Sequence, residues 1–434
     1  MTTPTSAGSR HRTTDVLVVG AGLAGLSAAR QASAAGARTR VIAKGWGAQY
    51  WLSGGIGVLG YHPLGQAQPV ASPADALAAL AADQPRHPYA LAGVSAVAEA
   101  VSDIQHACAD NGLALEGSID RNWLLSSPLG GRRPICLAPS TMTGGDLTRR
   151  DPMLIVGLTG YPDFPAGLVA ANLEAQDMAA TAAEVDLVSF RQRRFLNATV
   201  LASLFDLPEI REEAARAIRP RLGSAGRVGM PAVLGMESSE EAVSHLSDLL
   251  GVEVFEIATA PPSVPGIRLH RALVRGLVGS GVRVSSGMQV VGSESNGSTI
   301  EAVYSEAAAR RVRHAAGSFV IATGGILGGG LITDEDGSVT EVVADIPVKS
   351  PATRSDWFRR EVLDSAGHPI YRAGIEVDSG WRPLDSGKVV WENVTVAGGL
   401  LAEAETIREH SMDGVAVATG FLAGRAAAAS LVPG

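Results

Sequence analysis

The chain has 434 residues, of which 46% are hydrophobic and 18% are charged, a balance that excludes a disordered chain or a coiled coil. Its 36 basic and 44 acidic side chains give a formal net charge of −8, so no general attraction to nucleic acid or anionic lipid is expected. Cys108 and Cys136 are too few for a disulfide framework, a four-cysteine zinc site or an iron–sulfur cluster, and we expect no metal site.

The two ends of the chain favour a cytoplasmic protein. Residues before Asp15 are polar, without an apolar signal core, and the apolar residues 414–432 are mostly small and include Arg425. They fall short of the roughly 20 apolar residues of a membrane helix. We therefore expect a cytoplasmic chain that reaches the inner face of the membrane only through partners.

The first predicted elements form a strand–helix–strand unit. Residues 15–19 are a short apolar run, followed by Gly20-Ala-Gly22-Leu-Ala-Gly25, a helical stretch to residue 35 and a second strand at residues 38–43. In this context GxGxxG indicates a dinucleotide site: Gly20 permits the turn, Gly22 admits a pyrophosphate, and Gly25 lets helix and strand pack. Gly20, Gly22, Leu23, Ala24 and Gly25 are the expected contacts.

The end of the second strand departs from the usual fingerprint. The acid that holds a ribose hydroxyl would fall near Ala43 or Lys44, and neither residue is acidic. Lys44 and Arg40 could suit a 2′-phosphate, which leaves NADP open as a ligand, or Lys44 is a solvated strand end.

A second α/β domain is predicted in the middle of the chain. Strand-like runs at residues 151–156, 227–233 and 252–257 alternate with helical patterns at residues 164–181 and 238–250, and residues 195–218 read as a further helical piece. We interpret the arginines in this region as a solvated helical face, with partner docking as the alternative. They are Arg191, Arg193, Arg194, Arg211, Arg216, Arg219 and Arg221.

The first domain is predicted to resume near residue 264, with a helix at residues 266–278 and a strand at residues 282–291 that an Asn-Gly turn connects to a strand at residues 299–304. Two later strands, at residues 318–325 and 393–399, end in paired glycines. Such glycines are typical of a place where the backbone closely approaches a ligand. Ser411-Met-Asp413-Gly414 predicts a helix start, with Asp413 as N-cap and the helix over residues 415–430.

In this order the motifs resemble the two-domain flavoproteins that bind FAD in extended form. Residues 53–56, Ser-Gly-Gly-Ile, resemble the loop that faces the isoalloxazine in the fumarate reductase and succinate dehydrogenase flavoprotein group. Members with covalent FAD use a His just before this loop, whereas residues 49–52 here are Gln-Tyr-Trp-Leu. The resemblance therefore implies a non-covalent flavin.

A narrower resemblance is carried by residues 86–90, 156–164, 260–269 and 324–331, which are similar to the B-type subunit of anaerobic glycerol-3-phosphate dehydrogenase over essentially the whole chain. That family is usually assigned FMN and acts beside an FAD-containing A-type subunit and an iron–sulfur C-type subunit at the membrane. One departure is clear: a Gln-Gly-Cys-Gly-Gly-Gly-like loop in the family is replaced here by Arg-Glu-His-Ser-Met-Asp-Gly at residues 408–414.

The resemblance implies an α/β fold: a Rossmann-like FAD-binding domain of the two-dinucleotide-binding-domain type with an inserted α/β cap domain. Its parts would be residues 13–62, the cap at residues 63–263, and residues 264–434 with a small insertion at about 336–390. We favour FAD over FMN because the strand at residues 282–291 has a use beside an adenine. Further expected cofactor contacts are Ala43, Lys44, Ser53, Gly54, Gly55, Ile56, Val290, Thr323, Gly324, Gly325, Gly398, Gly399, Gly414 and Val415.

The implied activity is the oxidation of glycerol 3-phosphate to dihydroxyacetone phosphate, with hydride transfer to flavin and electrons passing to a partner or quinone. This chemistry needs a base and cationic groups. We expect Arg268, His270 and His410 to serve, with Arg354, Arg372 and Arg408 as further candidates. The alternatives are a flavin-binding electron-relay subunit without turnover and a fumarate reductase-like flavoprotein for another small acid. No HExxH, CxxC or GxSxG motif supports a hydrolase.

Overall fold

A computed structural model describes residues 14–191, 195–307 and 310–431. Its main sheet has five parallel strands in the order β11-β2-β1-β15-β20. β1 (Val16–Val19) lies between β2 (Thr39–Ile42) and β15 (Ser318–Ile321), and the outer strands are β11 (Arg283–Ser285) and β20 (Val394–Val396). Every residue of β1 and β15 is buried, as expected of central strands covered by helices.

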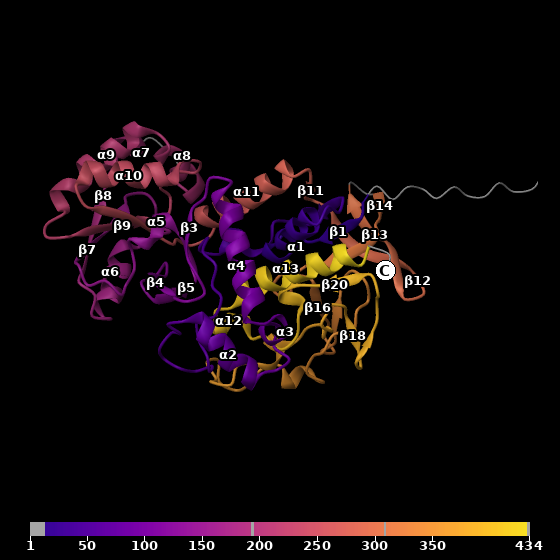
Figure 1. Cartoon of the computed structure of the whole chain (residues 1–434). Helices are drawn as coiled ribbons and strands as arrows, with labels where there is room; N and C mark the ends of the chain where they lie inside the picture. Colours follow the sequence, from indigo (N-terminus) through magenta and orange to yellow (C-terminus); the bar gives the residue numbers. More distant parts are fainter. Residues whose placement is uncertain (1–13, 192–194, 308–309, 432–434) are drawn as a thin grey trace, which may run out of the picture.

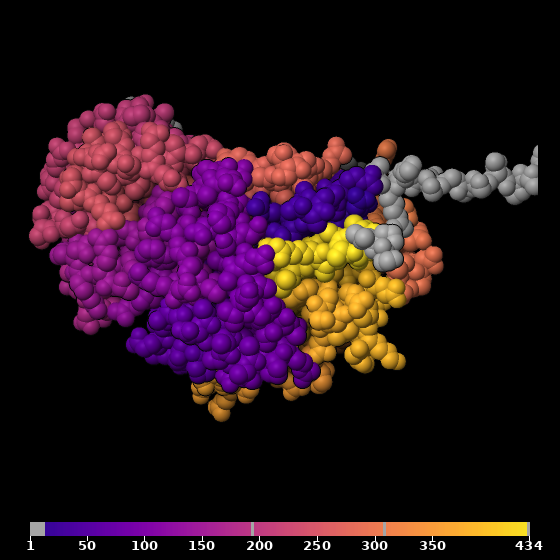
Figure 2. All heavy atoms as spheres, viewed as in Figure 1, coloured from indigo at the N-terminus to yellow at the C-terminus, as the bar shows by residue number. Residues whose placement is uncertain are grey.

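Two long helices pack together against this sheet (Figures 1 and 2). α1 (Leu23–Ala34) lies beside α13 (Met412–Ala429), indigo and yellow in the figures. A Cβ on Gly420 would lie 2.2 Å from the Ala24 carbonyl oxygen, and one on Gly424 would lie 2.2 Å from that of Ala28. These two glycines therefore let the backbones of the helices touch.

A three-stranded antiparallel sheet follows β11. It contains β12 (Gln289–Asn296), β13 (Thr299–Ala307) and β14 (Arg310–Ala315). The single strand expected at residues 282–291 is wrong: the chain breaks at Gly287, whose φ is +74°, so that β11 joins the parallel sheet and β12 joins the antiparallel one. The sequence also missed β14, because four of its six residues are Arg or His.

The middle of the chain forms a second parallel sheet in the order β10-β9-β7-β8. Its strands are β7 (Met153–Leu158), β8 (Ala180–Val185), β9 (Arg227–Pro231) and β10 (Glu253–Ile257). They pack with α6 (Ala166–Glu174), α7 (Val188–Arg191), α8 (Ala198–Phe205), α9 (Pro208–Ile218), η2 (Arg219–Arg221) and α10 (Ser239–Leu250). Figure 1 shows this unit to the left of the main sheet.

Two helix predictions in this region are corrected. The helix expected over residues 164–181 ends at Glu174, Asp177 takes a left-handed φ of 61°, and the alanine-rich β8 follows. Pairing with β7 thus overrides the helix preference of alanine in β8. The helical piece expected over residues 195–218 is two helices, because Pro208 has no N–H to continue α8.

The hydrophobic cores divide the chain later than expected. Most buried hydrophobic residues from Leu77 to Leu137 belong to the same core as β1 and α13, and the second core runs from Leu147 to Ile267. A small third cluster contains Leu125, Ile135, Ala138, Met142 and Ala232. Residues 147–263 are called the inserted unit below. The first core includes α2 (Pro73–Asp83), α3 (Pro88–Ala92) and α4 (Val94–Ala109), although we expected the cap domain to start at residue 63.

Short elements complete the fold. Between the cores lie β3 (Leu115–Gly117), β4 (Trp123–Ser126), β5 (Arg132–Ile135), β6 (Leu137–Pro139) and α5 (Ser140–Thr143), and α11 (Val264–Gly279) leads back to the main sheet. The remaining pieces are η1 (Gly47–Trp51), β16 (Leu331–Thr333), β17 (Val339–Glu341), η3 (Arg354–Asp356), η4 (Pro369–Arg372), β18 (Leu384–Asp385), β19 (Lys388–Val389), η5 (Gly398–Leu400) and α12 (Thr406–Glu409). Among the residues that the structure describes, no helix is long and apolar enough to cross a bilayer.

The predicted arginine face is only partly correct. Arg211 is 1% exposed and forms an ion pair of 3.0 Å with Glu241, so it is a buried residue. Arg191 and Arg216 do lie on the surface, where they pair with Asp186 and Glu212. Arg193 and Arg194 fall outside the described residues.

Candidate flavin and substrate site

The predicted glycine motifs meet at one edge of the main sheet. β1, β15 and β20 are parallel and adjacent, so the turns that follow them come together, as in other open α/β sheets. A Cβ on Gly20 would lie 2.2 Å from the Ala322 carbonyl oxygen, and a Cβ on Gly325 would lie 2.3 Å from that of Gly399. The backbones of the three turns are therefore in contact.

The glycines of the first turn have different environments. Gly20 has a φ of +121°, and a Cβ on Gly25 would lie 2.0 Å from the Gly20 carbonyl oxygen. A Cβ on Gly22 meets nothing closer than 4.0 Å, where it approaches Gly47 Cα. Gly20 and Gly25 are thus needed for packing, whereas Gly22 lies against the backbone of Gly47 at the start of α1, where the N-terminus of the helix suits a phosphate. Leu23 and Ala24 are buried in the same helical turn.

Residues 53–56 are the stretch that the resemblance places against the isoalloxazine, and they continue into a loop at residues 57–60, the Gly57–Gly60 loop. Ile56 pairs with Leu137, and Gly54 lies against Pro265, which a Cβ would approach to 2.5 Å. The Gly57 carbonyl oxygen accepts a hydrogen bond of 2.9 Å from Gly414 N–H. This loop is therefore attached directly to the first turn of α13, which also contains Val415.

The start of α13 differs from the prediction. The helix begins at Met412 with Ser411 in the N-cap position, so the expectation that Asp413 is the N-cap is wrong. The Asp413 carboxylate instead accepts a hydrogen bond of 3.3 Å from Gly57 N–H in the loop. Burial raises the pKa of Asp413 to about 6, although the charge of Arg133 opposes the shift.

A buried polar network also supports this loop. The Tyr89 hydroxyl donates to the Val58 carbonyl oxygen at 2.5 Å, and His87 Nε2 lies 3.2 Å from Glu409 Oε2. Ser411 Oγ also donates to Glu409, at 2.7 Å. Burial opposes ionisation of Glu409, but these hydrogen bonds bring its pKa below the usual value. Sequence reasoning gave none of these residues a role, although residues 86–90 carried part of the resemblance.

His410 lies next to the Gly57–Gly60 loop. A Cβ on Gly60 would lie 2.8 Å from His410 Cβ, and the His410 ring packs edge-on against Tyr61 with 5.0 Å between centroids. Burial and the charge of Arg133 lower the pKa of His410 to about 4. His410 Nδ1 and Arg133 Nε are both buried without a hydrogen-bond partner in the described part of the chain. His410 is thus a neutral imidazole at pH 7, and Arg133 on β5 is a cation that the sequence did not single out.

The structure does not bring Arg268 and His270 to this loop. Arg268 is 5% exposed, and its guanidinium donates to Glu256 at 2.7 and 3.0 Å and to the Gly235 carbonyl oxygen at 2.8 Å. His270 packs edge-on against Trp46 and Tyr50, with 4.9 and 5.6 Å between centroids, and burial lowers its pKa to about 4. Arg268 is thus a buried residue of α11 that packs against the inserted unit, and His270 lies beneath η1.

Residues expected near the adenine end lie around the end of β2. The Ala43 carbonyl oxygen accepts from Met288 N–H at 2.9 Å, which places the buried Val290 of β12 close to β2. Lys44 is exposed, whereas Arg40 Nη1 lies 3.4 Å from His314 Nδ1. Burial, followed by the charge of Arg283, lowers the pKa of Arg40.

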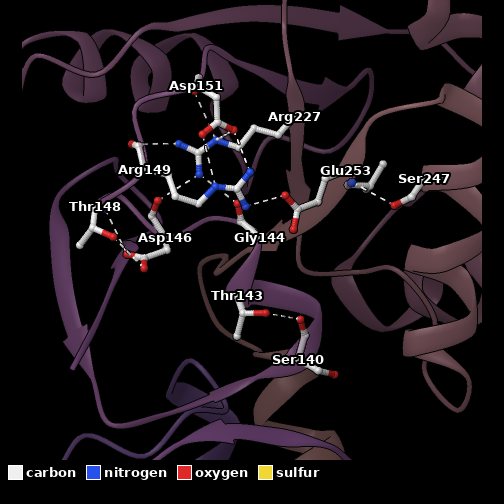
Figure 3. A network of polar contacts seen from close by, with 11 residues as sticks. Ser140, Thr143, Gly144, Asp146, Thr148, Arg149, Asp151, Arg227, Ser247 and Glu253 are labelled. Carbon is white, nitrogen blue, oxygen red and sulfur yellow. Dashed lines mark hydrogen bonds and ion pairs between the residues drawn. The ribbon is translucent and has the colours of Figure 1, made fainter. Parts of the chain in front are cut away.

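Figure 3 shows another buried cation, Arg227, which lies in the inserted unit. Its guanidinium donates to the carbonyl oxygens of Gly144 and Asp146 at 3.0 Å and lies 3.2 Å from the Asp151 carboxylate. Arg149 in the same network pairs with Asp151 and Glu253, at 2.9 and 2.6 Å. Because these donors face protein oxygens, Arg227 holds the loop before β7 in place.

The residues at the sheet edge fit an FAD. Two hydroxyl oxygens there, Ser53 Oγ and Thr323 Oγ1, are buried without a hydrogen-bond partner in the described part of the chain. They stand on the two turns expected to contact the cofactor, and such orphaned groups are costly unless a ligand satisfies them. Together with the N-terminus of α1 at Gly22, they provide polar contacts for a dinucleotide.

Comparison with known proteins agrees with this fit. A family described as "FAD binding domain" matches residues 15–414. A protein of Halobacterium salinarum, named as a probable B-type subunit of anaerobic glycerol-3-phosphate dehydrogenase, is 33% identical over 431 residues, covering 96% of this chain and 98% of the relative. A Pectobacterium atrosepticum protein, named as the B-type subunit of the same enzyme, is 32% identical over 413 residues, covering 93% and 96%.

Among solved structures, a flavocytochrome c3 fumarate reductase is similar with a TM-score of 0.45 and 12% identity, covering 98% of this chain and 80% of that one. The predicted fold class is confirmed by the family match, and the chain is an FAD-binding, flavin-dependent dehydrogenase. The chain belongs to the family of B-type subunits of anaerobic glycerol-3-phosphate dehydrogenase, within the FAD-binding flavoproteins.

Proposed function

We propose that the chain oxidises glycerol 3-phosphate to dihydroxyacetone phosphate. The names of relatives that match over 93% or more of the chain support this substrate. FAD, when bound, supplies the hydride acceptor. The protein has to remove the hydroxyl proton, hold the phosphate and keep water away.

His410 is the proposed base. Its ring is largely buried beside the Gly57–Gly60 loop, and its lowered pKa of about 4 leaves it neutral and able to accept a proton at pH 7. Nδ1 is buried without a hydrogen-bond partner among the described residues, so its hydrogen-bonding capacity is unused and a substrate hydroxyl brought to it would satisfy it. This orphaned nitrogen next to the loop is the observation that carries the assignment.

Arg133 is the proposed cation for the phosphate. Its positive charge acts to lower the pKa of both His410 and Asp413. Its buried Nε has no hydrogen-bond partner among the described residues. A planar guanidinium can bind a phosphate through two parallel hydrogen bonds. By contrast, the donors of Arg268 are used by Glu256 and Gly235, and we propose a structural role for that residue.

The remaining assignments are also proposals. We propose that FAD is bound without a covalent link, since residues 49–52 contain no His. Partner subunits, an A-type flavoprotein and an iron–sulfur protein, would receive the electrons and hold the chain at the inner face of the membrane. The names of the relatives, which describe each of them as one subunit of an enzyme, support an assembly of this kind.

One observation favours a second candidate function. By the resemblance, residues 408–414 stand where the family has a Gln-Gly-Cys-Gly-Gly-Gly-like loop, and His410 and Asp413 lie in this departure. A changed loop beside the flavin is consistent with an electron-relay subunit without turnover, or with another small acid as substrate.

The test is dye reduction by the purified chain loaded with FAD, with glycerol 3-phosphate, succinate and lactate as alternative substrates. We expect reduction with glycerol 3-phosphate alone. His410→Gln should lower kcat by roughly 10²–10⁴-fold with the FAD content unchanged, as expected for loss of a general base. Arg133→Gln should mainly raise KM, and His106→Gln, at an exposed position of α4, should change neither. An FAD-replete protein that reduces no dye with glycerol 3-phosphate contradicts the proposal.

A further inference from the structure

The start of α1 already carries a hydrogen-bond partner from the chain itself. Gln49, in η1, is 2% exposed. With its amide oriented as its neighbours require, the amide oxygen accepts from Leu23 N–H at 2.7 Å and the amide nitrogen donates to the Trp46 carbonyl oxygen at 2.6 Å. Leu23 is the first residue of α1, and its N–H is one of those that a helix cannot satisfy internally.

Backbone contact also covers the glycine turn. Gly47 has a φ of +73°, and a Cβ on it would lie 2.7 Å from Gly22 Cα and 3.3 Å from Gly22 N. The backbone of η1 therefore lies directly on Gly22, at the position where a dinucleotide fold places its pyrophosphate.

The inner side of η1 rests on the start of α11. Ser263 N–H donates to the Tyr50 carbonyl oxygen at 2.7 Å, and a Cβ on Gly266 would lie 1.8 Å from the Gln49 carbonyl oxygen. His270 packs between Trp46 and Tyr50. The outer side faces solvent, where Gly47 and Ala48 are exposed and Trp51 is 71% exposed. An outward movement of residues 46–51 would break the Ser263–Tyr50 hydrogen bond and remove Trp46 and Tyr50 from the edges of the two hydrophobic cores, while the buried residues of both cores stay packed against one another.

We propose that Gln49 occupies the pyrophosphate position in the cofactor-free chain, and that residues 46–51 move away from Gly22 when FAD binds. The amide oxygen and a phosphate oxygen seek the same N–H group. A hydrogen bond to an ionised phosphate is roughly twice as strong as one to a neutral amide, and the helix dipole adds to it. FAD therefore displaces Gln49, at the cost of the Leu23 and Trp46 hydrogen bonds. This proposal rests on FAD binding and not on the identity of the substrate.

Two substitutions at Gln49 test whether its side chain competes with FAD for the start of α1 or helps FAD to bind there. Gln49→Ala removes the competing oxygen, so the Kd for FAD of the cofactor-free protein should fall about three- to tenfold. Gln49→Glu places a carboxylate at the helix N-terminus, where it is held more strongly and repels the phosphates, so the Kd should rise more than tenfold. Gln68→Ala, at an exposed position, is the matched control and should leave the Kd unchanged. Quenching of flavin fluorescence during titration measures all three.

Amide hydrogen exchange of the wild-type chain gives a second readout that needs no variant. On addition of FAD, exchange should slow in residues 22–26 and quicken in residues 46–51. Equal weakening of FAD binding by Ala and Glu at position 49, or exchange in residues 46–51 that does not quicken, overturns the proposal. A wild-type chain that binds no FAD contradicts the cofactor assignment instead, whatever the Gln49 variants do.

Discussion

Adding a side chain at Gly22 or at Gly25, both in the turn after β1, should have different effects on FAD binding and on stability. The Cβ of Gly22→Val would meet no atom closer than Gly47 Cα, at 4.0 Å, so the chain should still fold but bind FAD at least about tenfold more weakly, because the side chain intrudes on the pyrophosphate. Gly25→Ala places a Cβ 2.0 Å from the Gly20 carbonyl oxygen and should lower the free energy of unfolding by about 1–3 kcal/mol.

Urea unfolding and flavin titration of the two variants measure these effects. Stoichiometric FAD in Gly22→Val would show that the turn does not hold the phosphates.

Asp413 should make stability depend on pH. Burial raises its folded-state pKa from 3.8 to about 6, so the neutral acid is favoured in the folded chain. The stabilising contribution is therefore complete below about pH 4 and is lost as the pH rises through 6. Asp413→Asn stays neutral, so its free energy of unfolding relative to wild type should increase by about 2–3 kcal/mol between pH 4 and pH 8.

Urea unfolding at a series of pH values measures this difference. Asp248→Asn, at an exposed position of α10, is the control and should give a flat difference. A flat difference for Asp413→Asn as well would mean that this carboxyl titrates normally.

At the scale of elements, the packing of α13 on α1 depends on its glycines. Gly424→Ala would place a Cβ 2.2 Å from the Ala28 carbonyl oxygen and push the helices apart. We expect it to lower the free energy of unfolding by about 1–3 kcal/mol. Gly279→Ala at the end of α11 meets no atom within 4 Å and should be neutral or slightly stabilising. Equal urea midpoints for the two variants would contradict this account of the helix contact.

Local sequence predicted the elements whose signal is apolar and continuous. The β1–α1–β2 unit, β15, β20 and α11 follow from apolar runs and glycine turns, which burial in a parallel sheet requires. β8 and β14 could not be predicted in the same way, because alanines and arginines become strands only through their neighbours in the sheet.

The candidate site shows the same limit. The glycine turns could be placed on one edge because strand order follows from the fold class. Arg133, Tyr89 and Glu409 come from β5, α3 and α12, and only tertiary packing brings them to the Gly57–Gly60 loop. Arg211 was expected at the surface because its neighbours in sequence are polar, yet α10 covers it.

At the scale of the whole molecule, the ion pair between Arg268 of α11 and Glu256 connects α11 to the inserted unit. Its partner Glu256 lies in β10 and also accepts hydrogen bonds from Thr141 and Leu234, at 2.7 and 2.8 Å. Arg268→Met leaves a buried carboxylate without its cation and should lower the free energy of unfolding by about 3–5 kcal/mol. The double variant Arg268→Met/Glu256→Gln should recover part of that loss.

Urea unfolding of the two variants measures the coupling between these residues. A double variant no more stable than Arg268→Met would mean that the unpaired charge is not the source of the loss.

The most direct test of the proposed function is a single turnover without any electron acceptor. The FAD-loaded chain is mixed anaerobically with glycerol 3-phosphate, and the visible absorbance of the flavin and the dihydroxyacetone phosphate formed are both followed. We expect the flavin to bleach fully, with one dihydroxyacetone phosphate formed per FAD. Flavin that stays oxidised in an FAD-replete chain would contradict catalysis by this chain and favour the electron-relay role.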